Sequence, residues 1–362
     1  MKNILILCCS GGKGGTGNSA NELALILCKS YKVHVVAEND FILESFHKIE
    51  NANLIVHSAE KGRKLAIIIR NTFYLKKIIK TWDIDLIITN TNKDALYSAL
   101  LNLLFVKVPR LIYVRDFQWI YRNFIWRFNP KSAILVPSEA LLERENYIPN
   151  TNITVIQNVT VVPDFFKVEQ NISGTFPAIP IVLHVANIAK LKGTIYLIQS
   201  FAIAKQKISN IRLCIVGQFV DKEYEKECLN LAKKLGIDSS IDYVNYTNNM
   251  KEQYEKCSMV VSSSISEFGG PETFGRTIIE GWSFAKPVIS FACGGPKYII
   301  ESGVDGFLVP EKDIEAMAEK IVLLAQNREL AGKMGLAGLK TVKDKYSAEA
   351  VEEQLKKIIG TK

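Results

Sequence analysis

The sequence of 362 residues lacks any apolar run of the roughly twenty residues that a membrane-spanning helix needs. The most apolar stretch, residues 96–108, is interrupted by Asn102 and Lys107. The run Ile4–Cys8 is too short for the core of a secretion signal and is followed at once by glycines, so we expect it to be a first buried strand. We therefore expect the chain not to cross a membrane.

Cysteine patterns that would indicate a disulfide framework or a zinc site are also missing. The seven cysteines are odd in number, scattered along the chain and without Cys-x-x-Cys or Cys/His spacing. They are typical of buried thiols in a reducing compartment, so we expect the protein to be cytoplasmic.

Long polar or compositionally biased tracts are absent, which excludes extended disorder as the main state of the chain. Hydrophobic residues make up 48% of the sequence and charged residues 23%, as in an ordinary globular protein. Because one hydrophobic core rarely grows to this chain length, the sequence predicts two domains.

The net charge of +8 is unevenly placed. Residues 61–131 contain 14 lysines and arginines against 4 acidic residues, and the remainder of the chain is close to neutral. This region is either a set of solvated helix faces or a surface for an anionic partner, such as a membrane surface or a lipid phosphate.

Short apolar runs alternate with amphipathic stretches along the whole chain, which indicates parallel sheets covered by helices on both faces. The expected strands of a first series are Ile4–Cys8, Lys32–Ala37, Leu54–His57, Leu86–Thr89, Arg110–Val114, Ala133–Pro137 and Thr154–Gln157. Those of a second series are Ile181–Ala186, Ile211–Val216, Ser240–Tyr243, Met259–Ser263, Pro287–Phe291 and Gly306–Val309. Helical patterns between them include Ala20–Lys29 and Lys61–Trp82.

The two series predict an α/β protein with two doubly wound, Rossmann-like domains. We expect a first domain over residues 1–165, a proline-containing linker over 166–180 and a second domain over 181–345. Residues 346–362 form a last helical pattern beyond the final strand, which could cross back to the first domain.

A glycine-rich stretch, Lys13–Ser19, reads KGGTGNS between the first strand and a helix. It nearly spells the loop KGGTGKS of partitioning-type ATPases, but Asn18 stands where that chemistry needs a lysine on the phosphates, which disfavours an ATPase. Small residues that open a helix, Gly15 and Gly17 among them, still present backbone N–H groups that suit a phosphate. The alternative is a tight turn without a ligand.

The most informative segment is residues 272–309, which read ETFGRTIIEGWSFAKPVISFACGGPKYIIESGVDGFLV. If a helix begins near Gly275, Glu280 lies inside it and Glu272 lies on the preceding loop. Both carboxylates can then flank one ligand held at the helix start, where a diphosphate would meet backbone N–H groups. The alternative is that Glu272 only complements the helix N-terminus and Glu280 is solvated.

This segment resembles the donor-site signature of glycosyltransferase family 4, a family of retaining enzymes with the two-domain GT-B fold. The resemblance implies that the domains face a central cleft and that the donor is bound by Thr273, Phe274, Gly275, Arg276 and Glu280, the last at the ribose. Residues 185–204 resemble the Gly-Arg-Leu-x-x-x-Lys-Gly segment of the family, which places Lys192 on the donor diphosphate. Asn187 falls on the usual arginine, whose charge and bidentate fork it cannot supply.

The first domain carries weaker resemblances to the same family. Residues 12–17 fit its glycine loop, which implies donor contacts from Gly15 and Gly17. The segment Tyr113–Asp116 resembles a site where many relatives carry His-Asp, so Arg115 and Asp116 are candidates for contact with the sugar or the acceptor.

The resemblance implies a metal-independent hexosyltransferase that uses a nucleotide-diphosphate sugar, without another cofactor, for surface polysaccharide such as lipopolysaccharide, O-antigen or capsule. Lys192 would stabilise the departing diphosphate and Glu272 would orient the sugar. Two alternatives are a non-catalytic protein that binds sugar nucleotides, favoured by Asn187 and Arg115, and a sugar-nucleotide epimerase. The acceptor implied is a glycan or a lipid-linked glycan, and no nucleic acid is expected.

Aromatic and basic residues interleave in Arg110–Lys131, which reads RLIYVRDFQWIYRNFIWRFNPK. Rings and guanidinium groups together suit a membrane interface, and the basic segment Lys61–Lys80 adds to one positive field. We therefore expect peripheral contact with an anionic membrane at its inner face. The alternative is that these rings pack inward on a core helix while the arginines are solvated.

Overall fold

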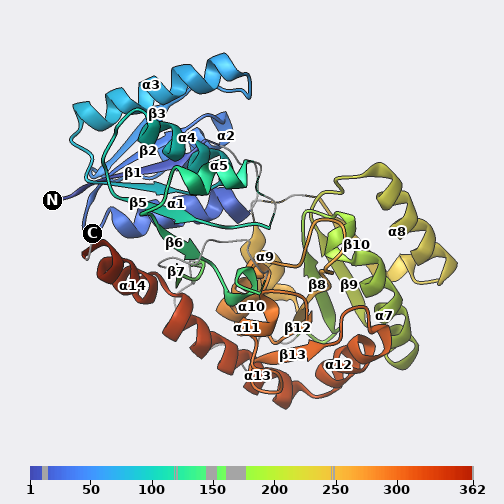
Figure 1. Ribbon diagram of the computed structural model, residues 1–362. Helices are drawn as coiled ribbons and strands as arrows, with labels where there is room; N and C mark the ends of the chain where they lie inside the picture. The colour runs from blue at the N-terminus through green and yellow to red at the C-terminus, as the bar shows by residue number, and fades with distance from the viewer. Residues whose placement is uncertain are drawn as a thin grey trace. The chain divides into compact units, whose positions relative to one another are not determined.

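The computed structural model of the protein describes residues 1–9, 15–117, 119, 121–143, 153–159, 177–245, 247 and 249–360. The chain divides into two compact units, residues 1–159 together with 348–362, and residues 160–347 (Figure 1). Most of the linker predicted at 166–180 lies outside the described residues, which resume at Pro177.

The first unit is built on a seven-stranded parallel sheet with the order β3-β2-β1-β4-β5-β6-β7. The strands are β1 (Asn3–Cys8), β2 (Lys32–Ala37), β3 (Leu54–Ser58), β4 (Leu86–Thr89), β5 (Arg110–Tyr113), β6 (Ala133–Val136) and β7 (Ile153–Val155). The order reverses between β1 and β4, which is the switch point where ligands of doubly wound sheets bind.

Helices cover both faces of this sheet, because alternate residues of each strand enter different cores. Ile4 and Ile6 pack under α1, α2 and α14, whereas Leu5 and Leu7 pack under α3 and α4. The helices of the unit are α1 (Gly15–Leu27), α2 (Asp40–His47), α3 (Leu65–Thr81), α4 (Asn92–Leu103), α5 (Arg122–Arg127), the 3₁₀ turn η1 (Glu139–Leu141) and α14 (Ala348–Gly360). Burial on both faces is why the strands read as continuous apolar runs.

The second unit has a six-stranded parallel sheet with the order β10-β9-β8-β11-β12-β13. Its strands are β8 (Ile181–Val185), β9 (Arg212–Val216), β10 (Ile241–Val244), β11 (Met259–Ser262), β12 (Val288–Phe291) and β13 (Gly306–Val309). The topology repeats that of the first six strands of the first unit, with its switch point between β8 and β11.

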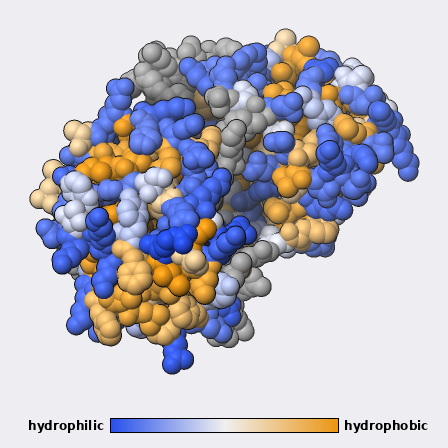
Figure 2. Space-filling view, turned by 90° about the horizontal axis from the view of Figure 1, so that it is seen from above, coloured by the Kyte–Doolittle hydropathy of each residue, from blue (hydrophilic) through white to orange (hydrophobic). Residues whose placement is uncertain are grey.

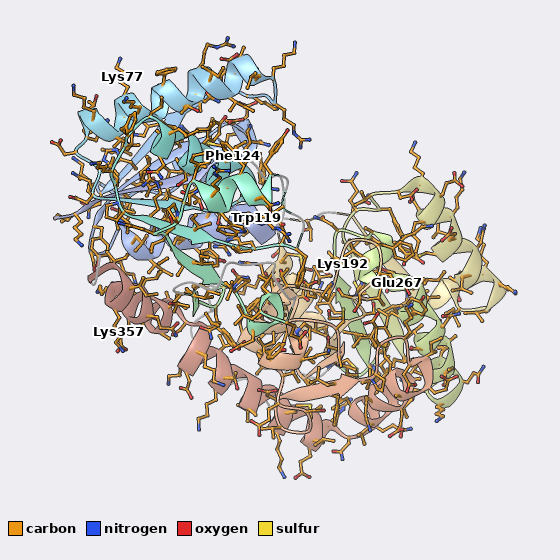
Figure 3. All side chains as sticks on the ribbon, viewed as in Figure 1. Lys77, Trp119, Phe124, Lys192, Glu267 and Lys357 are labelled. Carbon is orange, nitrogen blue, oxygen red and sulfur yellow. The ribbon has the colours of Figure 1, made fainter. Side chains whose placement is uncertain are left out.

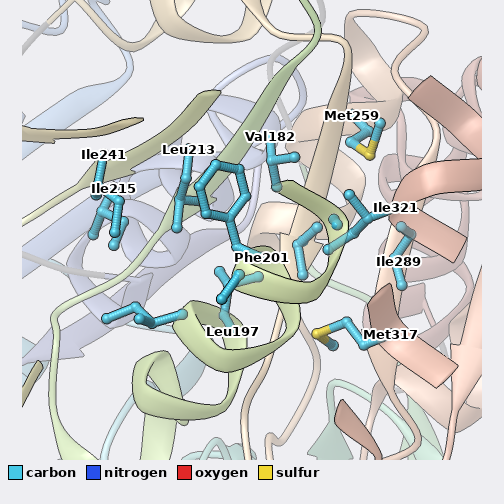
Figure 4. Close-up of a cluster of buried hydrophobic side chains, with 14 of the residues drawn as sticks. Val182, Leu197, Phe201, Leu213, Ile215, Ile241, Met259, Ile289, Met317 and Ile321 are labelled. Carbon is cyan, nitrogen blue, oxygen red and sulfur yellow. The ribbon is translucent and has the colours of Figure 1, made fainter. Parts of the chain in front are cut away.

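Two cores again sandwich the second sheet. Figure 4 shows the larger one, where Phe201 and Leu197 of α7 lie among side chains from β8, β9 and α12. The second core lies between the sheet and the elements α9, α10 and η5, the last of which is a π-helical turn. It contains the fully buried Trp282. The helical elements are η3 (Lys190–Lys192), α7 (Thr194–Lys207), α8 (Lys222–Lys234), η4 (Asp238–Ser240), α9 (Met250–Lys256), α10 (Arg276–Ser283), α11 (Pro296–Ile299), α12 (Ile314–Gln326), α13 (Arg328–Thr341) and η5 (Val342–Tyr346).

The predicted fold class of two Rossmann-like α/β domains is confirmed, while several element ends differ from the prediction. The first helix begins at Gly15 and not at Ala20, so part of the glycine-rich stretch is helical. Helix α3 begins at Leu65 and not at Lys61, because Lys64 is extended and offers no side-chain cap. The final helix α14 packs in the first unit, where Lys2 Nζ donates to the Ile359 carbonyl at 3.0 Å.

Candidate functional site

The main candidate site lies in the second unit, at the switch point of its sheet. The neighbouring strands β8 and β11 both lead into loops at the same sheet edge, the carboxyl ends of the parallel strands. The loop after β8 carries Lys192, and the long loop after β11 carries Glu272. The topology therefore brings together two residues that lie 80 positions apart in the chain.

Lys192 and Glu272 form an ion pair, with 2.5 Å between Lys192 Nζ and Glu272 Oε2. Their side chains keep 26% and 18% exposure, so a ligand can reach them. Ser264 donates a hydrogen bond to the same carboxylate oxygen at 3.2 Å. Burial raises the pKa of Glu272, but Lys192 and Ser264 favour the charged form more, so its pKa lies below the ordinary value. The site thus holds an ionised carboxylate beside a cation.

Backbone contacts hold the lysine in place. Gly193, with φ +60°, lies against β11 so closely that a Cβ would be 2.0 Å from the Ser263 carbonyl oxygen. The Ser263 hydroxyl donates to the Lys192 carbonyl at 2.9 Å, and Ile265 N donates to the Leu191 carbonyl at 2.9 Å. Glycine is therefore required directly after the lysine, where the family segment also has it.

The carboxylate loop is held by the glycine pair Gly294–Gly295. Gly295 N donates to the Glu272 carbonyl at 2.6 Å, and a Cβ on Gly294 would lie 2.2 Å from the same oxygen. A Cβ on Gly295 would lie 2.5 Å from Phe274 Cα. Only glycine fits at these two positions, because the two backbone segments lie so close together. This close contact positions Glu272.

Glu280 lies inside α10 and Glu272 on the loop before it, as their spacing predicts. Gly275 is the N-cap in the left-handed conformation at φ 102°, without a side-chain cap. The Tyr254 hydroxyl of α9 donates to Glu280 Oε2 at 2.7 Å, and Arg276 Nε lies 3.6 Å from Glu280 Oε1. The carboxylate is therefore oriented from two sides.

The remaining donor candidates of this unit differ in exposure. Phe274 is 1% exposed and packs edge-on against Tyr346, with ring centroids 5.7 Å apart, so its side chain belongs to the core. Thr273 is half-buried between Glu272 and Phe274, and Asn187 is exposed on the loop after β8. Only Asn187 among these three presents its side chain mainly to solvent.

Three polar residues near the site were not predicted from the sequence. Ser264 and Tyr254 contact the two glutamates as described, and His184 lies 2% exposed in β8. Its Nδ1 donates to the Val261 carbonyl at 3.0 Å, and its Nε2 lies 3.2 Å from the Thr194 hydroxyl. Burial lowers the pKa of His184 to about 4, so the imidazole is neutral. A serine run after a strand was the only available signal for Ser264, and none marked the other two.

The first-unit candidates surround the carboxyl edge of its own sheet. Gly15 and Gly17 lie in the first turn of α1, and residues 10–14, which include the start of the glycine-rich stretch, lie outside the described residues. Arg115 lies two residues after the end of β5, and its guanidinium carbon lies 3.7 Å from the centroid of the Tyr113 ring. Asp116 is exposed beside it.

Two amide oxygens orient the guanidinium of Arg115. Its Nε donates to Asn90 Oδ1 at 2.7 Å and its Nη1 to Asn158 Oδ1 at 2.6 Å. Asn90 follows β4 and Asn158 follows β7, so three strand ends converge on this arginine. The residue that replaces the family histidine is thus built into the sheet edge.

The aromatic residues of segment 110–131 pack largely on one another. Trp119 stacks on Trp126 with ring centroids 5.1 Å apart, and the ring centroids of Phe124 and Phe128 lie 4.8 Å apart. Figure 3 labels Trp119 and Phe124. Both tryptophans contact the core around Ile125, which favours the inward-packing alternative for these rings. Tyr121 is 66% exposed, and the membrane contact expected of this segment stays a prediction.

No group of three or more histidine, cysteine, aspartate or glutamate side chains suitable for a metal ion occurs among the described residues. None of the described helices combines the length and the apolar character that crossing a bilayer requires.

Two family models match successive parts of the chain. The model described as Glycosyltransferase Family 4 matches residues 13–160. The model described as Glycosyl transferases group 1 matches residues 166–341. Together they cover the first unit from residue 13 through its last strand, and nearly the whole second unit.

Curated relatives are bacterial glycosyltransferases and similar enzymes. A glycosyltransferase of Haemophilus influenzae is 28% identical over 232 residues, 63% of this chain and 61% of that protein. The capsular polysaccharide biosynthesis glycosyltransferase CapM of Staphylococcus aureus is 30% identical over 50% of this chain and 46% of its own length. This chain therefore spans less than two thirds of the length of these relatives.

One relative aligns over its full length. The GalNAc-alpha-(1->4)-GalNAc-alpha-(1->3)-diNAcBac-PP-undecaprenol alpha-1,4-N-acetyl-D-galactosaminyltransferase of Campylobacter jejuni is 25% identical over 100% of this chain and 99% of its own.

Solved structures share the fold over the whole chain. A glycosyltransferase of Rickettsia africae superposes with a TM-score of 0.83 at 22% identity, over 99% of this chain and 98% of that one. Anabaena HepE in complex with UDP-glucose gives 0.80 at 18% identity and full coverage of both chains. Staphylococcus aureus TarM, solved with Fondaparinux, alpha-GlcNAc-glycerol and UDP, gives 0.80 at 15% identity, over 99% and 100%. At these identities the likeness shows the GT-B fold alone.

Proposed function

We propose that the chain is a group 1 glycosyltransferase with a GT-B fold, and that it transfers a hexose-type sugar, with retention, from a nucleotide-diphosphate sugar to a glycan or lipid-linked glycan. The observation that carries the proposal is the Lys192–Glu272 ion pair at the switch point of the second sheet. A cation and an ionised carboxylate that are both partly exposed suit a leaving group that becomes more negative and a sugar that becomes more positive.

In the proposed reaction, the bond between the anomeric carbon and the diphosphate oxygen breaks while the acceptor hydroxyl attacks from the same face of the sugar. The proton of that hydroxyl passes to the departing diphosphate oxygen. Lys192 stabilises the negative charge on the departing diphosphate, and the N-terminus of α10 adds backbone N–H groups there. Glu272 orients the sugar through its hydroxyl groups and faces the developing oxocarbenium character. Because both groups already lie in place, little reorganisation is needed in the transition state.

Nucleotide recognition is assigned in this proposal to Glu280, which would accept hydrogen bonds from the ribose hydroxyls. Its contacts with Tyr254 and Arg276 hold the carboxylate in one orientation before the donor binds. No metal is assigned to the site, since Lys192 and the helix N-terminus supply the positive potential that the diphosphate needs.

The biological role we propose is synthesis of a bacterial surface polysaccharide, such as lipopolysaccharide, O-antigen or capsule, at the cytoplasmic face of the membrane. The capsular enzyme of Staphylococcus aureus and the undecaprenol-dependent enzyme of Campylobacter jejuni, to which the chain is similar, support this role. The HepE complex with UDP-glucose supports a nucleotide sugar as the donor.

The test is a donor screen with purified protein and a lipid-linked glycan acceptor. UDP-glucose, UDP-N-acetylgalactosamine, UDP-N-acetylglucosamine and GDP-mannose are first ranked by thermal stabilisation, since a bound donor stabilises the fold in proportion to the logarithm of its saturation. Turnover of the best donor should give a product with the donor's anomeric configuration, read by NMR. Activity should persist in excess chelator, and its loss with recovery on added Mg²⁺ or Mn²⁺ would contradict the metal-free assignment.

A non-catalytic role in sugar-nucleotide binding is the second candidate, because exposed Asn187 occupies the position of the family arginine. That role predicts donor binding without release of nucleoside diphosphate, with or without acceptor. An epimerase would instead release nucleoside diphosphate and free sugar without any acceptor. The same assay therefore separates all three functions.

A further inference from the structure

Helix α3 of the first unit exposes a row of large apolar side chains. Leu65, Ile69 and Phe73 are 72%, 47% and 57% exposed, and their spacing of four residues places them along one face. The opposite face carries Leu75 and Ile78, which are buried against the sheet. The exposed row is therefore an extra apolar face, because the helix is already anchored through its other side.

A second apolar element adjoins this face. Phe105, just beyond the end of α4, is 84% exposed and follows the partly exposed Leu103. Lys76 Nζ of α3 donates to the Leu104 carbonyl at 3.2 Å, which fixes this corner next to α3. We call Leu65, Ile69, Phe73, Leu103 and Phe105, together with the exposed basic residues of α3, the α3 surface. Figure 2, which looks down on the side where α3 lies, shows hydrophobic side chains among hydrophilic ones there.

Positive charge brackets the apolar row at both ends. The exposed Lys61, Arg63 and Lys64 precede the helix, and Lys76, Lys77 and Lys80 follow Phe73 (Figure 3 labels Lys77). No aspartate or glutamate occurs between residues 61 and 82. The charge of Arg70 is offset by Glu60. Its Nε and Nη2 donate to the two oxygens of the Glu60 carboxylate at 2.8 and 2.6 Å. The α3 surface therefore combines large exposed apolar side chains with positive charge around them.

We propose that the α3 surface docks on a bilayer of anionic phospholipid, with its apolar side chains at the headgroup–acyl boundary and its lysines on the lipid phosphates. The charge pattern selects this occupant over a protein partner or a second copy of the chain. A second copy would bring the same positive field against itself, and like charges across a contact are repulsive. An anionic lipid layer neutralises the lysines and offers apolar depth for Phe73 and Phe105.

This inference moves the membrane contact away from the segment Arg110–Lys131, whose tryptophans stack on each other, to a helix whose apolar residues face outward. It rests on the proposed function only in placing the acceptor in a membrane. Vesicle binding needs neither donor nor turnover, so the two proposals fail in different experiments.

The test is vesicle flotation of the full chain with phosphatidylcholine alone and with phosphatidylcholine and phosphatidylglycerol at three to one. We expect at least tenfold stronger binding to the anionic vesicles at low salt, and a marked loss at about 0.3 M salt, where the Debye length shortens to roughly 6 Å. The variant Lys64→Gln/Lys77→Gln/Lys80→Gln should bind at least tenfold more weakly, because each lysine near the surface contributes about fivefold.

The apolar contribution is tested by Ile69→Ser/Phe73→Ser, which keeps the charge and should weaken binding to anionic vesicles several-fold. Matched controls lie on the second unit, where Lys222→Gln/Lys233→Gln/Lys234→Gln removes the same charge from α8. Val220→Ser/Leu235→Ser likewise removes exposed apolar groups at the two ends of that helix. Both controls should bind like the wild type.

Three outcomes would overturn the proposal. The first is equal recovery of the wild type with neutral and anionic vesicles. The second is an equal loss in the α8 controls, which would indicate a response to net charge alone. The third is a dimer in lipid-free solution, seen by sedimentation, that Ile69→Ser/Phe73→Ser dissociates without any change in vesicle binding. An unchanged circular dichroism spectrum and an unchanged melting temperature show in each case that the variants are folded.

Discussion

The two units share one topology, and each has a carboxylate at its switch point. The two carboxylates differ in burial and in the groups that contact them. In the first unit, Asp94 of α4 is fully buried and accepts hydrogen bonds from Cys9 N at 2.7 Å and the Thr91 hydroxyl at 2.8 Å. In the second unit, Glu272 is partly exposed and is paired with Lys192. The first carboxylate ties the ends of β1 and β4 together, whereas the second stays partly exposed beside a cation.

The difference also appears in the direction of the pKa shifts. Burial raises the pKa of Asp94 to about 6, and its hydrogen bonds offset only part of that effect. Lys192 brings the pKa of Glu272 below its ordinary value. The same fold thus supports a buried acid in one unit and a partly exposed ion pair in the other, because the local chemistry depends on which side chains the strand ends carry.

The largest effect is expected from breaking the ion pair of the second unit. Lys192→Ala and Glu272→Ala should each lower kcat at least a hundredfold with the best donor, since both groups act on charge in the transition state. Lys226→Ala is the control, because its exposed pair with Glu223 on α8 contributes little. Near-wild-type turnover by a variant with an unchanged circular dichroism spectrum would remove the catalytic assignment.

The sequence predicts the architecture well because period and burial are local properties. The expected strand Lys32–Ala37 is observed with the same ends, and Ile181–Ala186 ends one residue earlier, at Val185. The spacing also predicts correctly that Glu272 lies on the loop before α10 and Glu280 inside that helix. The partners of these residues are not predicted, since contacts between separate elements depend on packing.

Tyr254 illustrates that limit, because it lies 26 positions before Glu280 on a different helix, and nothing in its own segment marks it. The aromatic segment illustrates the reverse case. Trp119 and Trp126 suggest an interface by composition, yet they stack beside the core. Composition reports which side chains are present, and packing decides which of them reach solvent.

Acidification should affect Asp94 and His184 in opposite directions. Asp94 has a folded pKa of about 6, above its unfolded value, so the folded state binds its proton more tightly. Its contribution to the free energy of unfolding therefore grows as the pH falls from 7.5 to 5, by about 1–2 kcal/mol. Asp94→Asn removes this contribution, so the wild type should gain stability relative to the variant on acidification. Urea unfolding at the two pH values measures it, and a difference independent of pH would contradict the assignment.

His184 provides the opposite sign in the second unit. Burial lowers its folded pKa to about 4, so the unfolded chain takes up the proton first as the pH falls below about 6.5. The wild type should lose about 1–2 kcal/mol between pH 7.5 and 5 relative to His184→Gln, which does not titrate. Because Val261 and Thr194 bind the imidazole, the variant is expected to be less stable at pH 7.5. The gap between the two proteins should narrow on acidification, and a widening gap would disprove the neutral buried imidazole.

The smallest effect is expected from Tyr254, a buried residue of the second unit to which we assign the positioning of Glu280 in the donor site. Its hydroxyl donates to Glu280 Oε2, and Tyr254→Phe removes that single hydrogen bond while the ring keeps its stack on Phe284. With Glu280 held only by Arg276, we expect the KM for the donor to rise about three- to tenfold with kcat nearly unchanged. Tyr224→Phe is the matched control, since Tyr224 is equally buried and its hydroxyl contacts Ile195 N and not Glu280.

If Tyr254 had only a structural role, Tyr254→Phe would weaken the binding of all nucleotides alike. If its hydroxyl positions Glu280, the substitution would weaken the recognition of the ribose. Calorimetry should therefore compare the nucleoside diphosphate released by the wild-type reaction with its 2′-deoxy and 3′-deoxy analogues. Wild type and Tyr224→Phe should discriminate against at least one analogue, and Tyr254→Phe should lose most of that discrimination because the carboxylate that reads the hydroxyl is no longer oriented. Tyr254→Phe could instead bind every nucleotide several-fold more weakly and keep the wild-type ratio between the affinities for intact and deoxy nucleotides. In that case the hydroxyl supports only the packing of α9. If wild type itself shows no preference for the intact ribose, the assignment of Glu280 falls and that of Tyr254 falls with it.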